Sequence, residues 1–119
     1  MKSDIIRLTP KQIKFLKRDF ELLKFSSDFE LVYELQIPNT GIVLISGELS
    51  IFQKNKIHTT VQPGHLLGVK AIINSKPVEH GCKVTGDSEL ILLHKTDIMK
   101  ALSDKDSELY AIIKEKILS

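Results

Sequence analysis

The sequence predicts a mainly β fold with flanking helices, in the form of an antiparallel β-roll (jelly roll). Residues 29–37 alternate apolar and polar side chains, as a half-buried strand does. Between residues 29 and 94, further apolar runs are separated by turn signals about every 8 to 12 residues, a spacing typical of sandwiches, rolls and barrels. Apolar residues at helical spacing flank this region, at residues 10–24 and 97–118.

The first predicted element is an amphipathic helix over residues 10–24. Thr9 can cap its N-terminus, and Pro10 suits the first helical position because it has no amide hydrogen to leave unpaired. One apolar stripe follows at steps of three and four, formed by Ile13, Leu16, Phe20 and Leu23. We expect this stripe to pack on the domain. Asp19 and Glu21 among the lysines argue against a basic helix lying on a membrane.

Strands and turns are expected next. Residues 29–37 predict a strand, and residues 38–41 a turn. The continuous apolar run 42–45 indicates a central strand. Ser46-Gly47 predicts a hairpin turn after it, because glycine accepts a positive φ at low cost. A second turn is predicted at residues 54–56.

The most informative stretch runs from residue 61 to residue 93. Pro63-Gly64 forms a turn, Gly68 follows, and a short apolar segment of roughly one helical turn ends at Ile73. A glycine-led turn that opens a short helix exposes backbone amide groups, and such groups can bind an anion.

This stretch resembles the phosphate-binding cassette of the cyclic-nucleotide-binding domain, the β-roll of catabolite activator proteins, kinase regulatory subunits and nucleotide-gated channels. The matching residues lie within 63–73 and are Pro63-Gly64, Leu67-Gly68 and Ala71-Ile72-Ile73. Residues 42–49 resemble the family's Ser-Gly hairpin, and residues 84–93 its later strands. The resemblance implies a β-roll over residues 29–94, within a single domain spanning residues 1–119.

The resemblance also implies a ligand pocket, and two polar residues expected there are missing. In members that bind a nucleotide, a Glu after the cassette glycine accepts from the ribose, and an Arg near the end of the next loop pairs with the phosphate. Val69 stands at the Glu position, and the two arginines, Arg7 and Arg18, are both expected in the N-terminal helix. Losing a charged hydrogen bond in a buried site costs about 2–5 kcal/mol. The candidate residues of this vestigial pocket are Leu67, Gly68, Val69, Lys70, Ala71, His80, Gly81, Cys82 and Lys83.

Three functions stay open on the sequence. The first is a stand-alone, non-catalytic regulatory or protein-interaction module that has lost nucleotide binding and acts through a protein partner. The second is a small-ligand sensor, in which Lys70, Lys83 and His80 replace the arginine and hold a cyclic nucleotide or another anion. The third is a metal enzyme of the cupin kind. The four histidines are scattered without a His-x-His pair or zinc-ligand spacing, so we expect no enzyme, metal or cofactor.

Composition restricts the partners. A net charge of +2 and an aromatic content of 6% give no electrostatic or stacking signal for nucleic acid. No apolar run approaches the roughly 20 residues of a membrane span, so we expect no membrane partner. The single cysteine, Cys82, excludes an internal disulfide, favours a reducing cytoplasmic setting and is expected to be a small buried filler.

Helices are predicted again over residues 97–118. Thr96 can cap the first, and Ser103 with Asp106 resembles a capping box before the second. The apolar stripe of the last helix consists of Leu109, Ile112, Ile113 and Ile117. This stripe can fold back on the roll or pair with a second copy as a homodimer, and the sequence does not choose between them.

Overall fold

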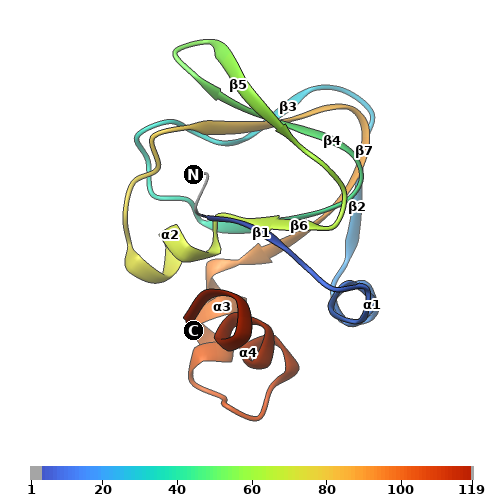
Figure 1. Cartoon of the computed structure of the whole chain (residues 1–119), viewed down its shortest axis with the longest axis vertical. Helices are drawn as coiled ribbons and strands as arrows, with labels where there is room; N and C mark the ends of the chain where they lie inside the picture. The colour runs from blue at the N-terminus through green and yellow to red at the C-terminus, as the bar shows by residue number, and fades with distance from the viewer. Residues whose placement is uncertain (1–3, 119) are drawn as a thin grey trace.

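Antiparallel strands form the body of the fold, and residues 4–118 of the chain are described by a computed structural model (Figure 1). The strands are β1 (Ile5–Arg7), β2 (Leu22–Phe25), β3 (Phe29–Val32), β4 (Thr40–Gln53), β5 (Lys56–Val61), β6 (His65–Leu67) and β7 (Gly81–His94). The helices are α1 (Pro10–Asp19), α2 (Val69–Asn74), α3 (Lys95–Leu102) and α4 (Glu108–Ile113), which continues as a π-helical turn (Lys114–Leu118). The predicted fold class, an antiparallel β-roll with flanking helices, is confirmed.

The two longest strands, β4 and β7, form the centre of the roll. They pair from Thr40 with His94 to Phe52 with Gly81, and each runs through both layers of strands (Figure 1). β6 and β1 extend the pair on one side of the roll, and β2 pairs along β7. β5 pairs with β4 and β3 with β7 on the other side (Figure 1). The core is therefore enclosed by one continuous antiparallel pair and its neighbours, as a roll requires.

The hairpin turn expected at Ser46-Gly47 was wrong. The chain continues through this point as one strand, and the register with β7 shifts between Leu44 and Ser46 and again between Ser46 and Glu48. Gly47 has φ +91°, and the side chain of Ser88 fills the space where a Cβ would lie. Apolar residues on both sides of Gly47 pair with the same partner strand, so the irregularity bends β4 from one layer to the other and does not reverse it.

The first helix is also shorter than expected. It begins as predicted, with a capping box between Thr9 and Gln12 and Pro10 in the first turn. It ends at Asp19, not at residue 24, and residues 22–25 form β2 on the edge of β7. The free edge of β7 offers this Leu-Leu-Lys-Phe segment main-chain hydrogen bonds, and tertiary pairing overrides the weak helical preference of four residues.

Two further boundaries differ. The strand expected over residues 29–37 ends at Val32. Leu35 then has φ +63°, and its backbone amide donates to the Val78 carbonyl at 2.7 Å. The turn predicted at residues 54–56 is confirmed, with positive φ at both Lys54 and Asn55.

The C-terminal helices begin at residues other than those expected. His94, with Asp97, caps α3 in place of Thr96, and Ser107 caps α4 in place of Ser103. Ile112 and Ile113 are 5% and 1% exposed. The stripe of α4 therefore packs on the roll within one chain, and homodimerisation through this helix stays a prediction.

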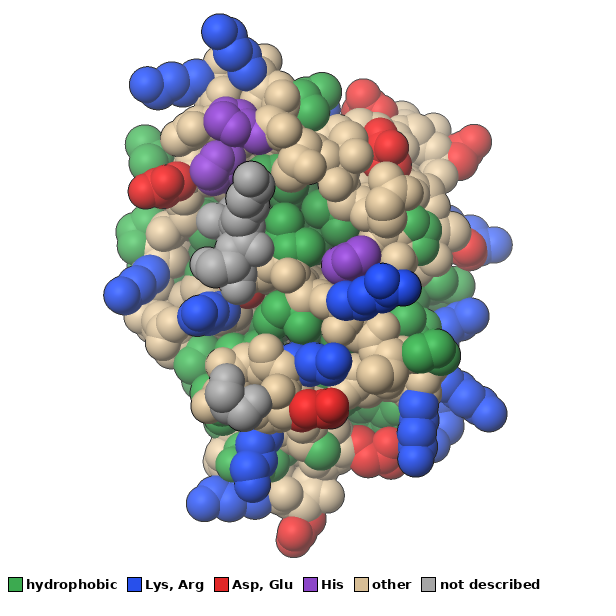
Figure 2. Space-filling model, viewed as in Figure 1, with side chains coloured by type: hydrophobic (Ala, Val, Ile, Leu, Met, Phe, Trp, Pro, Cys, Tyr) green, Lys and Arg blue, Asp and Glu red, His purple; other side chains and the backbone are tan. Residues whose placement is uncertain are grey.

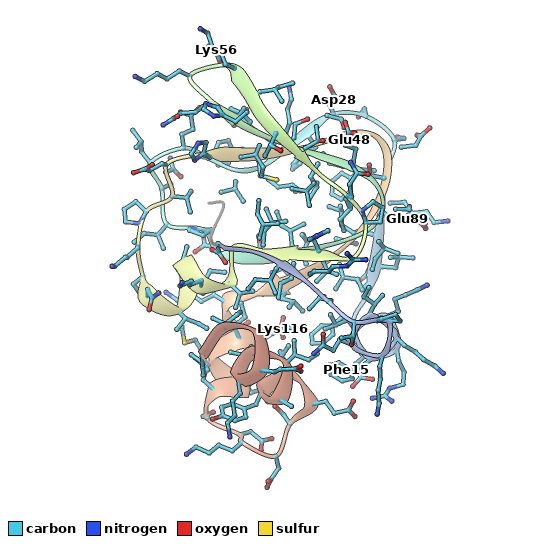
Figure 3. All side chains as sticks on the ribbon, in the orientation of Figure 1. Phe15, Asp28, Glu48, Lys56, Glu89 and Lys116 are labelled. Carbon is cyan, nitrogen blue, oxygen red and sulfur yellow. The ribbon has the colours of Figure 1, made fainter. Side chains whose placement is uncertain are left out.

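Two apolar clusters hold the structure together. One lies inside the roll and includes Ile42, Leu44, Leu49, Leu67, Cys82 and Val84. The other joins the roll to the helices and includes Leu16, Leu66, Val69, Ile72, Ile98 and Ile113. Figure 3 shows Phe15 between α1 and the C-terminal helices, close to the contacts that Arg18 makes with Glu108 and Gln12 makes with Glu115. Within residues 4–118, no helix is long and apolar enough to cross a membrane.

Candidate functional site

The cassette is a strand, a left-handed glycine and a short helix in succession. β6 ends at Leu67, Gly68 adopts φ +91°, and α2 begins at Val69. Gly68 is the N-cap of α2 and provides no side chain to cap it. A Cβ on Gly68 would lie 3.2 Å from the Thr40 carbonyl oxygen, so the backbone here is both left-handed and close to β4. The first amides of α2 have no acceptor within the helix and need one from elsewhere.

Asp4 provides that acceptor. Its Oδ1 accepts a hydrogen bond from the Lys70 amide at 3.0 Å, and its Oδ2 accepts one from the Ala71 amide at 3.1 Å. The residue is only 5% exposed. The cassette amides thus hold a carboxylate that belongs to the chain itself, at the point where a helix N-terminus favours negative charge.

Two opposing effects act on the ionisation of Asp4. Burial, the larger effect, raises the pKa of the Asp4 carboxyl above its ordinary value, because the charged form loses solvation. Hydrogen bonds from the backbone of Lys70, Ala71 and Gly68 lower the same pKa. Because burial outweighs these bonds, the carboxylate is held in its place at some electrostatic cost.

A cleft of about 300 Å³ opens beside Asp4. It lies between α2 and the loop before β7, and its lining residues are Asp4, Lys70, Ala71, Asn74, Lys76, Pro77, Val78 and Glu79. Two lysines and two carboxylates therefore border the cleft. Of the nine residues predicted for the pocket, Lys70 and Ala71 line it.

Three of the other predicted residues are packed in the core. Val69 is 1% exposed and belongs to the cluster between the roll and the helices. Leu67 and Cys82 are fully buried inside the roll. Burial raises the pKa of the Cys82 thiol to about 12, so this group is protonated at neutral pH. These three side chains contribute packing, and none of them lines the cleft.

Three further candidates, His80, Gly81 and Lys83, do not line the cleft. The His80 ring stands edge-to-face against His58 of β5, with ring centroids 4.9 Å apart. Figure 2 shows a patch of histidine side chains on the face in view. Within the described residues, the buried His80 Nδ1 has no hydrogen-bond partner. Gly81 packs directly on the Phe52 ring, where no side chain would fit. Lys83 lies within β7 and pairs with both β3 and β4.

Sequence reasoning missed the residue that the cassette amides bind. The one local signal is an acid directly before the apolar pair Ile5-Ile6. Its role depends on the pairing of β1 with β6, which brings Asp4 to amides 66 and 67 positions later in the chain. Within residues 4–118, no group of three or more His, Cys, Asp or Glu side chains could hold a metal ion.

Comparison with solved structures shows which known proteins share this fold. No protein-family model matches the sequence, and no curated protein matches it. A protein solved for "A cyclic-GMP-dependent signalling pathway regulates bacterial phytopathogenesis" superposes with a TM-score of 0.71 and 18% identity, over 92% of this chain and 89% of that one. The cyclic nucleotide-binding-like protein from Brucella abortus bv. 1 str. 9-941 gives 0.64 and 23%, over 81% and 86%.

A third solved structure, PKAR CBD2 bound to Sp-2Cl-cAMPS, gives a TM-score of 0.62 and 16% identity, over 91% of this chain and 78% of that one. Agreement over most of both chains at such low identity is agreement of fold. The chain therefore has the fold of a cyclic-nucleotide-binding domain.

Proposed function

We propose that this chain is a non-catalytic regulatory module that acts through contact with a partner protein and does not take up a cyclic nucleotide in the family's manner. One observation carries the proposal: the Asp4 carboxylate already accepts from the Lys70 and Ala71 amides. A nucleotide phosphate bound at those amides would have to displace Asp4 or share the site with it.

Sharing the site is unfavourable on electrostatic grounds. Two like charges about 4 Å apart repel by about 4 kcal/mol at the effective dielectric constant of a protein surface. Displacing Asp4 breaks two hydrogen bonds to a charged group, each contributing about 1.5–3 kcal/mol. Both terms oppose nucleotide binding.

The groups that would offset this loss are elsewhere. Val69, at the position of the expected acid, is buried in the core. Arg7 is exposed on β1 and pairs in register with His65. Arg18 of α1 forms ion pairs with Asp19 and Glu108. Since neither guanidinium lines the cleft, a bound phosphate would lack the bidentate partner that gives the family its affinity.

Thermal unfolding with cyclic AMP, cyclic GMP and cyclic di-GMP tests the proposal. A ligand at about 100 times its Kd stabilises the folded state by about 2.7 kcal/mol, which is readily detected. We expect the Tm of the wild-type chain to stay unchanged up to about 1 mM of each nucleotide, beyond a matched salt control. A saturable rise in Tm at micromolar nucleotide would contradict the proposal.

A second candidate function is a sensor of a small anion, and the cleft favours it. Its volume of about 300 Å³ lies at the lower end for small-ligand sites, and Lys70 and Lys76 border it. Calorimetry of the wild-type chain with inorganic phosphate and cyclic AMP tests this function. A sensor requires binding that weakens at least tenfold in the double variant Lys70→Ala, Lys76→Ala, and no binding by the wild-type chain rules it out.

A further inference from the structure

The N-terminal strand β1 brings the chain's own anion to the cassette. We infer that β1 is an autoinhibitory strap, which fills the cassette cradle with the Asp4 carboxylate and excludes other anions from it. The cradle is defined here as the backbone amides of Lys70 and Ala71. The inference deepens the proposed function and rests on it in one respect, since both require the cassette to be closed to nucleotides.

Strand register places the carboxylate at the cradle. β1 runs antiparallel to β6, with Ile5 opposite Leu67 and Arg7 opposite His65. The residue before β1 therefore meets the residues that follow β6, where α2 begins. Figure 1 shows the two strands side by side, with the start of β1 on the side of α2. Pairing in any other register would move Asp4 away from the two amides.

The contact differs from an ordinary helix cap. A helix is normally capped by the residue directly before its first turn, but that position is Gly68, which has no side chain. The acceptor comes instead from 66 and 67 residues earlier in the chain. Both carboxylate oxygens are used, one for each of two successive amides, which is how an oxyanion is held at a helix N-terminus.

β1 is a short element that is held at both of its ends. It contains three residues, lies at the edge of the sheet and pairs with β6 alone. At its C-terminal end, the Leu8 amide donates to the Gly64 carbonyl at 2.9 Å, and Leu8 is 4% exposed. At its N-terminal end, Asp4 is the described residue bonded to the cassette through its side chain. Loss of the carboxylate therefore empties the cradle while Leu8 keeps β1 in register.

The variant Asp4→Ala with sodium formate is the direct test, because formate supplies the carboxylate that the substitution removes. We expect Asp4→Ala to lower the Tm by roughly 5 °C or more. Formate should then raise that Tm in a saturable way, beyond sodium chloride at equal ionic strength. In ¹⁵N–¹H spectra, formate should shift the Lys70 and Ala71 amide resonances of the variant and leave those of the wild-type chain in place.

A matched control is Asp28→Ala. Asp28 is exposed and accepts a backbone hydrogen bond from Gly86 at 2.9 Å, so the variant has the same change of charge and also loses one amide acceptor. Because Asp28 does not bond to the cradle amides, formate should change the Tm of Asp28→Ala no more than chloride does. Asp4→Asn is a second variant if Asp4→Ala does not fold, since its single carbonyl oxygen still satisfies one of the two amides.

The inference is overturned if formate shifts the Lys70 and Ala71 resonances of Asp4→Ala no more than those of the wild-type chain. It is overturned too if formate stabilises Asp28→Ala as much as it stabilises Asp4→Ala. It is also overturned if the wild-type cradle binds formate as strongly as the variant. The proposed function fails by a different measurement, namely cyclic nucleotide binding to the wild-type chain. The two failures are therefore read from different samples and different ligands.

Discussion

The carboxylate of Asp4 and the backbone amide of Lys70 are joined by a hydrogen bond of 3.0 Å that links the start of the chain to its cassette. Burial raises the pKa of this carboxyl, although the backbone amides oppose the rise. Cassette and strap are thus coupled through one ionisable group, and the coupling has a measurable dependence on pH.

The first prediction concerns acid conditions. Because the folded-state pKa of Asp4 is raised above its ordinary value of 3.8, the folded state binds this proton more tightly than the unfolded state does. The favourable contribution is complete below pH 3.8 and is lost as the pH rises through the folded-state pKa. In urea unfolding, the stability of the wild-type chain relative to Asp4→Asn should fall over this range. Lys70, Lys76 and Glu79 border the same cleft and are unchanged in both proteins.

An unchanged difference between the two proteins across the acid range would show that Asp4 titrates as it does in the unfolded chain. A difference that grew with pH would show that the amides outweigh burial.

The second prediction concerns the missing acid of the cassette. Val69→Glu restores the residue type that the family resemblance implies, but the side chain at this position is 1% exposed and lies in the core. Burying an unpaired carboxyl there should cost several kcal/mol, at least about 3, so we expect loss of the folded state and no gain of cyclic AMP binding. Lys70→Glu, one residue along and exposed, is the control and should fold. A folded Val69→Glu that binds cyclic AMP would show that this position can face a ligand.

The third prediction concerns Gly68. Alanine at φ +91° is strained, and its Cβ would lie 3.2 Å from the Thr40 carbonyl oxygen, so Gly68→Ala should lose about 1–3 kcal/mol of unfolding free energy. Gly86 has φ +64° with nothing within 4 Å of a Cβ, which makes Gly86→Ala a control with strain and no close contact. Urea titration of both variants separates the two effects. Equal losses would mean that the contact with β4 is unimportant.

The fourth prediction concerns Cys82. Its thiol is fully buried, and burial raises its pKa to about 12, so the reactive thiolate is scarce and inaccessible. Iodoacetamide at about pH 8 should leave the native chain unmodified and label it at the rate of unfolding once urea is added. Mass spectrometry gives the readout, and rapid labelling without urea would indicate local opening of β7.

The sequence predicts the elements whose signals are local. Thr9-Pro10 marks the start of α1, and Lys54-Asn55 marks a two-residue hairpin, because both depend on residues adjacent in the chain. Residues 22–25 carry no such signal, since their strand exists only because β7 offers an edge. Gly47 has an unambiguous conformation, but a turn and a bulge both accept it, and only the partner strand decides between them.

The candidate site divides in the same way. Gly68 and the amides of Lys70 and Ala71 follow from the cassette pattern, because a left-handed glycine before a helix exposes those groups. The occupant does not follow from it. The direction in which the Val69 side chain points is set by core packing. The position of Asp4 is set by the register between β1 and β6, which are far apart in the sequence.

The order in which the chain is synthesised gives the strap a further consequence. Asp4 leaves the ribosome before the amides that it will bind, which are made 66 and 67 residues later. The cradle can be completed only when β6 and α2 have emerged and turned back to meet β1. Because Asp4 is already present when these elements emerge, the chain's own anion is available to the site as soon as β1 pairs with β6.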